Sequence, residues 1–302
     1  MSNNLKFSII IPSYNEGDDI RLSIDSAIKQ DYQNKEIIVV DDSSDNTPKI
    51  IKEYADKGVN LIIGPRKGCC GARNLGMKSA SGDIIVLLNA DVSLPPDFLS
   101  RVSRHYDDGA DYVLIEARAF NLDNLWAKFI EMQHRYDMEK IGETAEWTEG
   151  FSCRRQAALD IGLIPGDFSA RFCRDWLLGK RLWEAGYKKV IDYSIIVTHK
   201  SPDNFKDYWR VRKARGRFGS LMQYFLYKKP LPFLFFKFLV KDVLFLLKFL
   251  TVFPAVIKTV KISRYSDSPF KDFFPFFYAY FIQEIARAVG EWEGLLIALK
   301  IK

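Results

Sequence analysis

The chain has 302 residues, of which 27% are charged and 48% hydrophobic, and its formal net charge at pH 7 is +6. This composition is ordinary for a globular protein and excludes a wholly disordered chain, while the length allows one large α/β domain with an appendage or two small domains. The four cysteines lack Cys-x-x-Cys spacing, which argues against a zinc site and a disulfide framework and favours a reducing compartment.

Charge and aromatic residues are unevenly distributed along the chain. Residues 1–199 hold 25 Lys+Arg against 30 Asp+Glu, whereas residues 200–302 hold 19 against 8 and are rich in Phe and Tyr. Because these cations are interleaved with long apolar runs, we expect the tail to bind an anionic membrane surface and not nucleic acid. A solvated basic face on a helical subdomain is the alternative. The polar start of the chain runs directly into a predicted strand without a signal sequence, so we expect the front domain to stay in the cytosol.

The first third of the chain alternates predicted strands and helices. Apolar, β-rich runs predict strands at residues 6–11, 35–40 and 59–63. Apolar residues at helical spacing from Ile20 to Ile28 predict a helix between the first two strands, and Asp45 or Asn46 can cap another helix before the third. This order predicts a mostly parallel, Rossmann-like sheet covered on both faces by helices.

The stretch from Gly68 to Leu99 continues this pattern. It reads as a glycine-rich turn, a short helix from about residue 72 to 79, and a strand at Ile84–Leu88 that is buried on both faces. The strand ends on Asn89-Ala90-Asp91. Ligands of open α/β sheets bind outside the carboxyl ends of the strands, so Asp91 is placed where a ligand or a metal would be met. Farther on, a strand is predicted at residues 112–117 and a helix at 126–140.

Three motifs in this order resemble those of a known family. They are Ile-Pro-Ser-Tyr-Asn-Glu at residues 11–16, Val-Val-Asp-Asp-Ser-Ser-Asp at 39–45, and Ala-Arg-Asn-x-Gly at 72–76 followed by Asn-x-Asp at 89–91. Over roughly residues 5–200 the chain resembles the inverting family 2 glycosyltransferases, which have the GT-A fold. One departure is that Asn89 stands at the first acidic position of the family's Asp-x-Asp motif.

The resemblance implies a nucleotide-sugar donor, with UDP as the expected nucleotide. Asp41 resembles the family's base-binding carboxylate, which can accept the imide N–H of uracil. The other residues expected to bind the donor are Pro12, Tyr14, Glu16, Arg73, Asn89, Asp91 and Arg215. Arginine suits the phosphates through its bidentate fork. The alternatives are that the loop residues only cap strands and that the arginines around 215 attract anionic lipid.

A divalent cation, Mn²⁺ or Mg²⁺, is also implied. Asp91 would hold the ion between the two phosphates of the donor, and His199 is a candidate for a further ligand or for a pyrophosphate contact. A purely structural role is the alternative for both residues. A carboxylate after a strand often caps a helix, and a single histidine often only makes a local hydrogen bond.

A further block of residues carries the expected catalytic base. The family has a Glu-Asp pair before a Trp; here Arg174 replaces the Glu, and Asp175 is kept before Trp176. Inverting transfer is a single displacement, which needs one carboxylate within hydrogen-bond reach of the acceptor hydroxyl. We therefore expect Asp175 to be the general base. The alternative is that Asp175 only caps the helix predicted at Trp176–Glu184.

The tail begins with a long apolar stretch, Leu231–Phe253, that contains three lysines and one aspartate. At ~100° per residue Lys237, Lys241 and Lys248 lie within about 40° of one another on one helix face. Each charge at the centre of a spanning helix would cost about 2.5–3.5 kcal/mol. We therefore expect a helix in the plane of the membrane, with its lysines toward the lipid headgroups.

Residues 275–301 have the same amphipathic pattern, with Glu284, Arg287 and Glu291 in one polar stripe. We predict a GT-A catalytic domain at residues 1–220 and an amphipathic helical tail at 221–302 for membrane association or oligomerisation. In the alternative arrangement, both polar stripes form a buried interface of a homodimer or larger oligomer.

Together these features predict a metal-dependent, inverting glycosyltransferase of the hexosyltransferase type. It would transfer a sugar to a hydroxyl of a lipid-linked acceptor in glycan or polysaccharide assembly, at the cytoplasmic face of the cell membrane, as a peripheral or monotopic protein. Two alternatives stay open: a polyprenyl-phosphate sugar synthase, and a catalytically degraded scaffold that binds nucleotide sugars without turnover.

Overall fold

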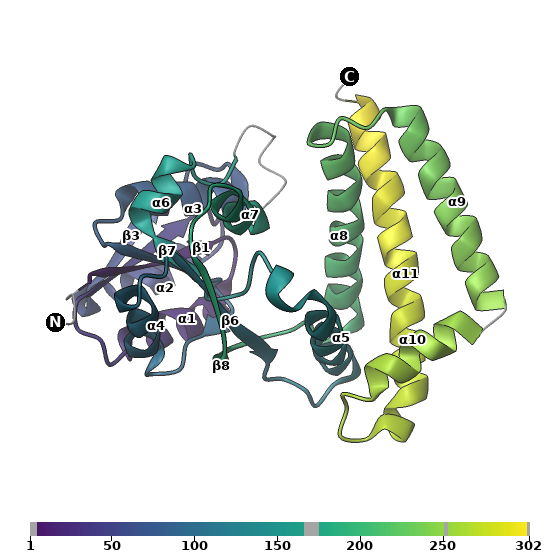
Figure 1. Cartoon of the computed structure of the whole chain (residues 1–302), viewed down its shortest axis with the longest axis horizontal. Helices are drawn as coiled ribbons and strands as arrows, with labels where there is room; N and C mark the ends of the chain where they lie inside the picture. Colours follow the sequence, from purple (N-terminus) through teal and green to yellow (C-terminus); the bar gives the residue numbers. More distant parts are fainter. Residues whose placement is uncertain (1–4, 166–174, 251–252, 301–302) are drawn as a thin grey trace. The chain divides into compact units, whose positions relative to one another are not determined.

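The computed structural model of the chain describes residues 5–165, 175–250 and 253–300, with the side chains of residues 18 and 248–250 left out (Figure 1). The chain divides into two compact units. The sheet unit comprises residues 1–118 and 143–199, and the helical unit comprises residues 119–142 and 200–302. Arg174 and the other residues of 166–174 lie outside the described residues.

The described part of the sheet unit is built on one mixed, eight-stranded sheet in the order β3-β2-β1-β4-β7-β6-β8-β5. The strands are β1 Phe7–Ser13, β2 Lys35–Asp41, β3 Val59–Ile63, β4 Ile84–Leu87, β5 Val92–Ser93, β6 Tyr112–Ala119, β7 Ser152–Arg154 and β8 Lys189–His199. The first four strands pair in parallel, as predicted, with Ile9 of β1 opposite both Ile37 and Val86. Antiparallel pairs then extend the sheet, β4 with β7, β7 with β6, and β5 with β8.

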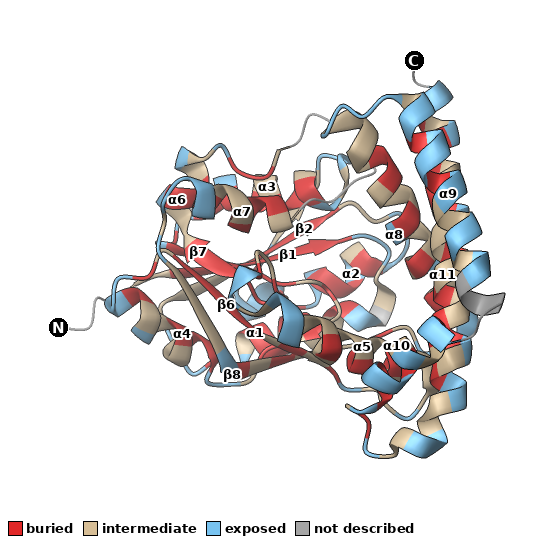
Figure 2. Ribbon diagram, turned by 45° about the vertical axis from the view of Figure 1, so that its right-hand side comes forward, coloured by how far each residue is buried: buried red, intermediate tan, exposed pale blue. Residues whose placement is uncertain are grey.

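Helices cover both faces of this sheet, with α3, α6 and α7 on one side and α1 and α4 on the other (Figure 2). The helices of the unit are α1 Ile20–Ile28, α2 Thr47–Lys52, α3 Gly68–Ser79, α4 Phe98–Asp107, α6 Arg155–Asp160 and α7 Trp176–Glu184. The strands are buried between them because their side chains are apolar on both faces, and Ile84, Val86 and Leu88 around β4 are fully buried. The predicted buried strand after the central helix is thereby confirmed, one residue shorter than expected.

The helical unit contains α5 Leu125–Ile141, α8 Phe205–Phe225, α9 Leu231–Leu250, α10 Phe253–Ser263 and α11 Pro269–Lys300. In Figure 1, α11 lies between α8 and α9. One apolar cluster joins Phe129 and Met132 of α5 to Tyr208 of α8 and to Phe276 and Tyr280 of α11. Among the described residues, no helix combines the length and the apolar character that crossing a bilayer requires.

The polar residues of α9 make contacts within the helical unit. Lys241 of α9 pairs with Glu291 of α11, and Lys237 donates to Gln223 of α8 while remaining exposed. The two polar stripes found in the sequence therefore meet at Lys241 and Glu291 inside one chain. The expectation that the lysines face lipid headgroups is wrong for Lys241, which points toward α11, and stays a prediction for Lys237.

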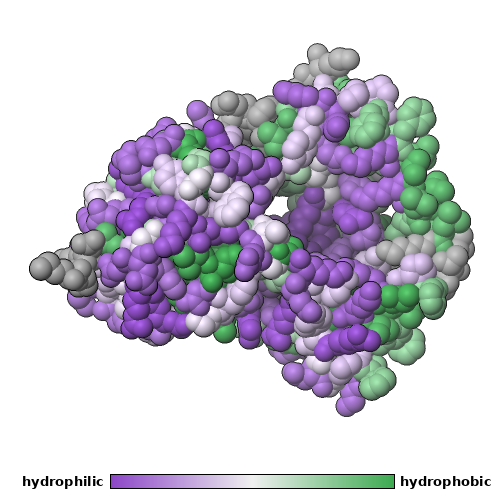
Figure 3. Space-filling model, in the orientation of Figure 1, coloured by the Kyte–Doolittle hydropathy of each residue, from purple (hydrophilic) through white to green (hydrophobic). Residues whose placement is uncertain are grey.

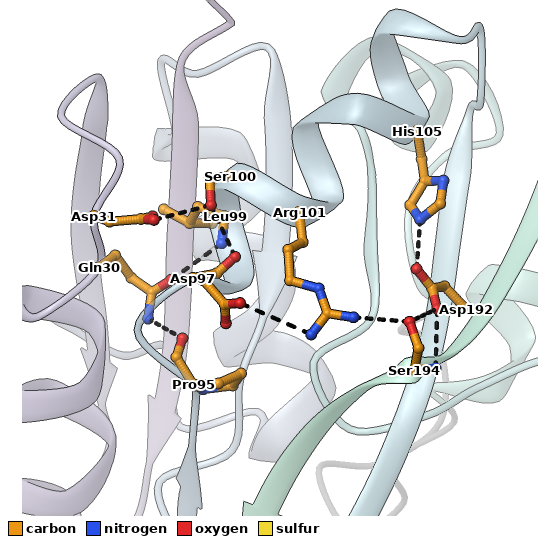
Figure 4. Close-up of polar contacts among 10 residues, drawn as sticks. All are labelled: Gln30, Asp31, Pro95, Asp97, Leu99, Ser100, Arg101, His105, Asp192 and Ser194. Atoms are coloured by element: carbon orange, nitrogen blue, oxygen red, sulfur yellow. Dashed lines mark hydrogen bonds and ion pairs between the residues drawn. The ribbon is translucent and has the colours of Figure 1, made fainter.

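Polar contacts fasten α4 to the rest of the sheet unit (Figure 4). Gln30 accepts from the backbone N–H of Leu99 at 3.1 Å and donates to the carbonyl of Pro95 at 2.8 Å. At the other end of the helix, Nε2 of His105 lies 2.8 Å from Oδ2 of Asp192 on β8. Burial alone would raise the pKa of Asp192, but hydrogen bonds from Ser194 and His105 outweigh it and hold this pKa below its usual range.

We expect Asp192→Asn to lower the free energy of unfolding at pH 7 by about 1 kcal/mol, since it removes the acceptor of these hydrogen bonds. A carboxyl whose pKa is lowered in the folded state stabilises the protein above its unfolded pKa, about 4, and loses that effect as the pH falls through the folded value. Urea denaturation of both proteins at pH 7, 5 and 3.5 should therefore show a difference that shrinks at the lowest pH. An equal difference at all three pH values would contradict this assignment.

Candidate functional site

A cavity of about 750 Å³ opens at the carboxyl ends of β1, β2 and β4. Five of the residues predicted to bind a donor line it, from two of the sequence motifs: Pro12, Tyr14, Glu16, Asn89 and Asp91. The other lining residues are Ser13, Asp42, Ser44, Arg66, Gly68, Cys69, Ala72 and Ala90. The parallel strands bring these loops together because their carboxyl ends share one edge of the sheet.

Asp42 lines the cavity, whereas the neighbouring Asp41, which was expected to bind the base, is not among the lining residues. The side chain of Asp41 is buried, and its carboxylate accepts hydrogen bonds from the hydroxyl of Ser43 at 2.6 Å and from its backbone N–H at 3.3 Å. Asp42 lines the cavity and accepts from the backbone N–H of Arg66 at 2.8 Å. A Cβ on Gly64 would lie 2.2 Å from Oδ1 of Asp42, so only glycine leaves room for this carboxylate.

Behind the cavity, the side chain of Arg73 on α3 is 1% exposed and joins residues from two other motifs. Its Nη2 donates to Oδ1 of Asn89 at 2.5 Å, and its Nη1 donates to Oδ2 of Asp175 at 2.8 Å. The guanidinium carbon also lies 5.0 Å from the ring centre of Trp147. The amide of Asn89 and the carboxylate of Asp175 thus both bind one guanidinium, which suits its forked N–H groups.

Asp175 is the N-cap residue of α7, and its Oδ1 accepts from the backbone N–H of Trp176 at 3.0 Å. Its other oxygen forms the ion pair with Arg73, while 27% of the side chain remains exposed. The capping alternative is therefore correct as a description of the geometry. It does not exclude a second role, because a carboxylate has acceptor sites beyond these two bonds.

Asp91 and His199 lie on adjoining parts of the sheet. Val92, next to Asp91, pairs with His199 at the end of β8. The hydroxyl of Ser23 donates to the carbonyl of Asn89 at 2.8 Å and holds the turn that carries Asp91. No group of three or more His, Cys, Asp or Glu side chains among the described residues forms a complete metal cage. A carboxylate and an imidazole nevertheless fit a divalent ion that takes its remaining oxygen ligands from phosphate and water.

The other predicted donor residue, Arg215, lies on α8 in the helical unit and is exposed. The ion pair of Arg73 with Asp175 and the lining role of Asp42 are what the sequence reasoning missed. The doubled aspartate at the end of β2 was the available signal for Asp42, because adjacent strand residues point to opposite faces of a sheet.

Comparison with known proteins agrees with this geometry. Residues 8–170 match the family model described as glycosyl transferase family 2. The chain is 35% identical over 129 residues to the UDP-Glc:α-D-GlcNAc-diphosphoundecaprenol β-1,3-glucosyltransferase of Escherichia coli, covering 42% of this chain and 51% of that protein. It is 29% identical over 203 residues to the dolichol-phosphate mannosyltransferase of Pyrococcus furiosus, covering 62% and 55%. The chain thus spans about half the length of these curated relatives.

Among solved structures, the chain is similar to a mannosyltransferase of Pyrobaculum calidifontis in complex with GDP-Man and Mn²⁺. The TM-score is 0.58 at 20% sequence identity, covering 99% of this chain and 76% of that one. At this identity the likeness establishes the fold alone, and it confirms the predicted GT-A, Rossmann-like sheet covered by helices.

The position of Arg73 depends on the close packing of α3 against the sheet. A Cβ on Gly76 would lie 2.4 Å from Cγ2 of Ile10 and 3.3 Å from Cγ2 of Val40, both in buried strands. We expect Gly76→Ala to destabilise the protein by about 1–3 kcal/mol through overpacking. Gly219→Ala is the matched control, because nothing lies within 4 Å of its Cβ position and alanine favours helix by up to about 1 kcal/mol. Thermal denaturation of both variants checks this; equal melting temperatures would contradict it.

Proposed function

This chain belongs to glycosyl transferase family 2, and from that premise we propose that it transfers a sugar from a nucleoside-diphosphate sugar to a hydroxyl of a lipid-linked acceptor. The observation that carries the proposal is the cavity in which the loop after β1, the loop after β2 and the Asn89-Ala90-Asp91 turn meet. A volume of about 750 Å³ is suited to a ligand of this size.

The donor would lie along these loops. Tyr14 is 64% exposed in the lining and offers a ring face to the base, while Asp42 offers a carboxylate that can accept a base N–H. Asp41, the expected base-binding residue, is buried and accepts two hydrogen bonds from Ser43, so we propose Asp42 first for this role. We keep UDP as the proposed nucleotide, since the relative from Escherichia coli is named for UDP-Glc, and GDP as its competitor, since the structural neighbour holds GDP-Man.

Asp175 would remove the proton from the acceptor hydroxyl as the sugar is transferred. The Arg73 bond orients its carboxylate and the Trp176 N–H fixes its other oxygen, so the group is held in one place before an acceptor arrives. A single displacement with inversion needs no covalent intermediate, and this one carboxylate is sufficient as a base.

Asp91, with His199 beside it, would hold Mn²⁺ or Mg²⁺ together with the donor phosphates. When bound, such an ion supplies Lewis-acid stabilisation of the departing pyrophosphate. The chain's own contribution is to hold the Asp91 carboxylate at the cavity mouth, through the turn fixed by Ser23.

The lipid-linked acceptor is proposed from the names of relatives that act on diphosphoundecaprenol and dolichol phosphate. Such acceptors stay in a bilayer, which supports a location at the cytoplasmic face of the cell membrane. The dolichol-phosphate relative also favours a second candidate, a polyprenyl-phosphate sugar synthase, whose acceptor is the lipid phosphate itself. Asn89 at an acidic position of the family motif favours a third, a scaffold that binds the donor without turnover.

We expect purified protein to bind UDP more tightly than GDP or CMP, and only in the presence of Mn²⁺. Removal of the metal with a chelator, or Asp91→Ala, should weaken UDP binding by at least about tenfold. Isothermal titration of each nucleotide with and without Mn²⁺ measures this, with Asp97→Ala as a control carboxylate outside the cavity lining. Tight binding of UDP without any metal would refute the role of Asp91.

We expect Asp175→Asn to lower the transfer rate by about 10²–10⁴ while leaving donor affinity nearly unchanged, because the amide keeps a hydrogen-bonding shape but cannot accept the proton. The readout is sugar transfer from UDP-sugars to polyprenyl-diphosphate acceptors, with polyprenyl phosphate tested in parallel. Transfer to polyprenyl phosphate alone would favour the synthase, and UDP binding by the wild type without transfer to either acceptor would favour the scaffold. Full activity of the variant would remove Asp175 from the mechanism.

A further inference from the structure

Helix α9 buries Leu234 and Phe238 within the helical unit and exposes many of its other apolar side chains. Six of them lie within about 100° of one another around the helix. They are Phe233, Phe236, Val240, Val243, Leu244 and Leu247, and between 48% and 63% of each is exposed. Figure 3 shows this apolar surface along α9 and over α10. We call these six residues the α9 outer face.

Two charged side chains of α9 make contacts within the helical unit. Lys241 pairs with Glu291, which is 7% exposed, and Asp242 accepts from Nε1 of Trp292 at 2.6 Å. Exposing six large apolar side chains together is unfavourable for a helix whose outer face meets water. The same arrangement is favourable when the outer face meets hydrocarbon.

The contact of α8 with α11 has a related character. A Cβ on Gly290 would lie 2.0 Å from the carbonyl oxygen of Lys213, and one on Gly216 would lie 2.1 Å from that of Arg287. Backbones that touch through small residues are typical of helices that associate within lipid, where side-chain burial supplies little driving force. The contact of α8 with α11 thus uses small residues, while the six large apolar side chains of the α9 outer face remain exposed.

We propose that the α9 outer face docks on an anionic lipid bilayer, with the helix in the membrane plane and these side chains inserted at the boundary of headgroups and acyl chains. Charge selects lipid over a second copy of the chain. Residues 200–302 hold 19 Lys+Arg against 8 Asp+Glu, and Lys228 and Lys229 are exposed at the start of α9. Two such units repel each other, whereas anionic headgroups attract them.

The orientation refines the one expected from the sequence. Lys241, on the lysine face that was expected to meet headgroups, pairs with Glu291 of α11, whereas Lys237 is exposed next to the α9 outer face. The cations placed to meet headgroups are then Lys237 on the helix and Lys228 and Lys229 before it. This docking does not depend on which nucleotide or acceptor the sheet unit uses.

The test is flotation of the full chain with vesicles of phosphatidylcholine and phosphatidylglycerol. Wild-type protein should float with the vesicles, and Val240→Glu with Leu244→Glu should weaken the partition by at least roughly tenfold, because two carboxylates would enter the apolar layer. Ile63→Glu is the matched control, since Ile63 is 70% exposed but lies in the sheet unit. It should float like the wild type.

Two flotation results would overturn the proposal: wild-type protein that stays below the vesicles, or a double variant that floats as well as the wild type. A third contrary result would come from sedimentation velocity. It is a wild-type dimer that does not bind vesicles and that the double substitution converts to a monomer. Thermal denaturation of the double variant establishes that it is folded. UDP titration of the same samples separates a failure of docking from a failure of the proposed donor site.

Discussion

A guanidinium that is buried within a protein must find partners for its charge and its N–H groups, because an unpaired one would cost several kcal/mol. The partners of Arg73 include the amide of Asn89 after β4, the carboxylate of Asp175 at the start of α7 and the ring of Trp147. Three segments that are distant in the sequence are thereby held together beside the cavity. The same guanidinium thus links the Asn89-Ala90-Asp91 turn to the candidate base.

The parallel half of the fold could be predicted from local patterns. Val59–Ile63 and Trp176–Glu184 were predicted with the bounds that β3 and α7 have, because apolar runs and turn residues mark their ends. β5 and β7 were not predicted as strands, since segments of two and three residues carry no readable period. The pair of Arg73 with Asp175 was beyond reach for another reason: it spans 102 residues and leaves no trace in local spacing.

The tail shows a different limit of sequence reasoning. Helical spacing located the lysines of α9 and the acidic stripe of α11, but a period does not reveal which face of a helix is inside. Lys241 and Glu291 could each have met solvent, and only their complementary charges and the packing of α9 on α11 decide that they meet each other. Asp41 and Asp42 pose the same question within the sheet unit, where two adjacent carboxylates point to opposite sides and one of them lines the cavity.

The helical unit is discontinuous in the chain, since α5 is inserted between β6 and β7 while its partners follow residue 200. During synthesis, α5 therefore leaves the ribosome well before Tyr208 and Phe276, the aromatic residues that cover Phe129. At a synthesis rate of ~5–20 residues per second, the apolar side of α5 stays uncovered for several seconds or longer before residues near 276 are made. In that interval the nascent chain exposes the apolar face of α5 beside strands that can already pair. Chaperones or a nearby membrane would bind the largest apolar surface during this period.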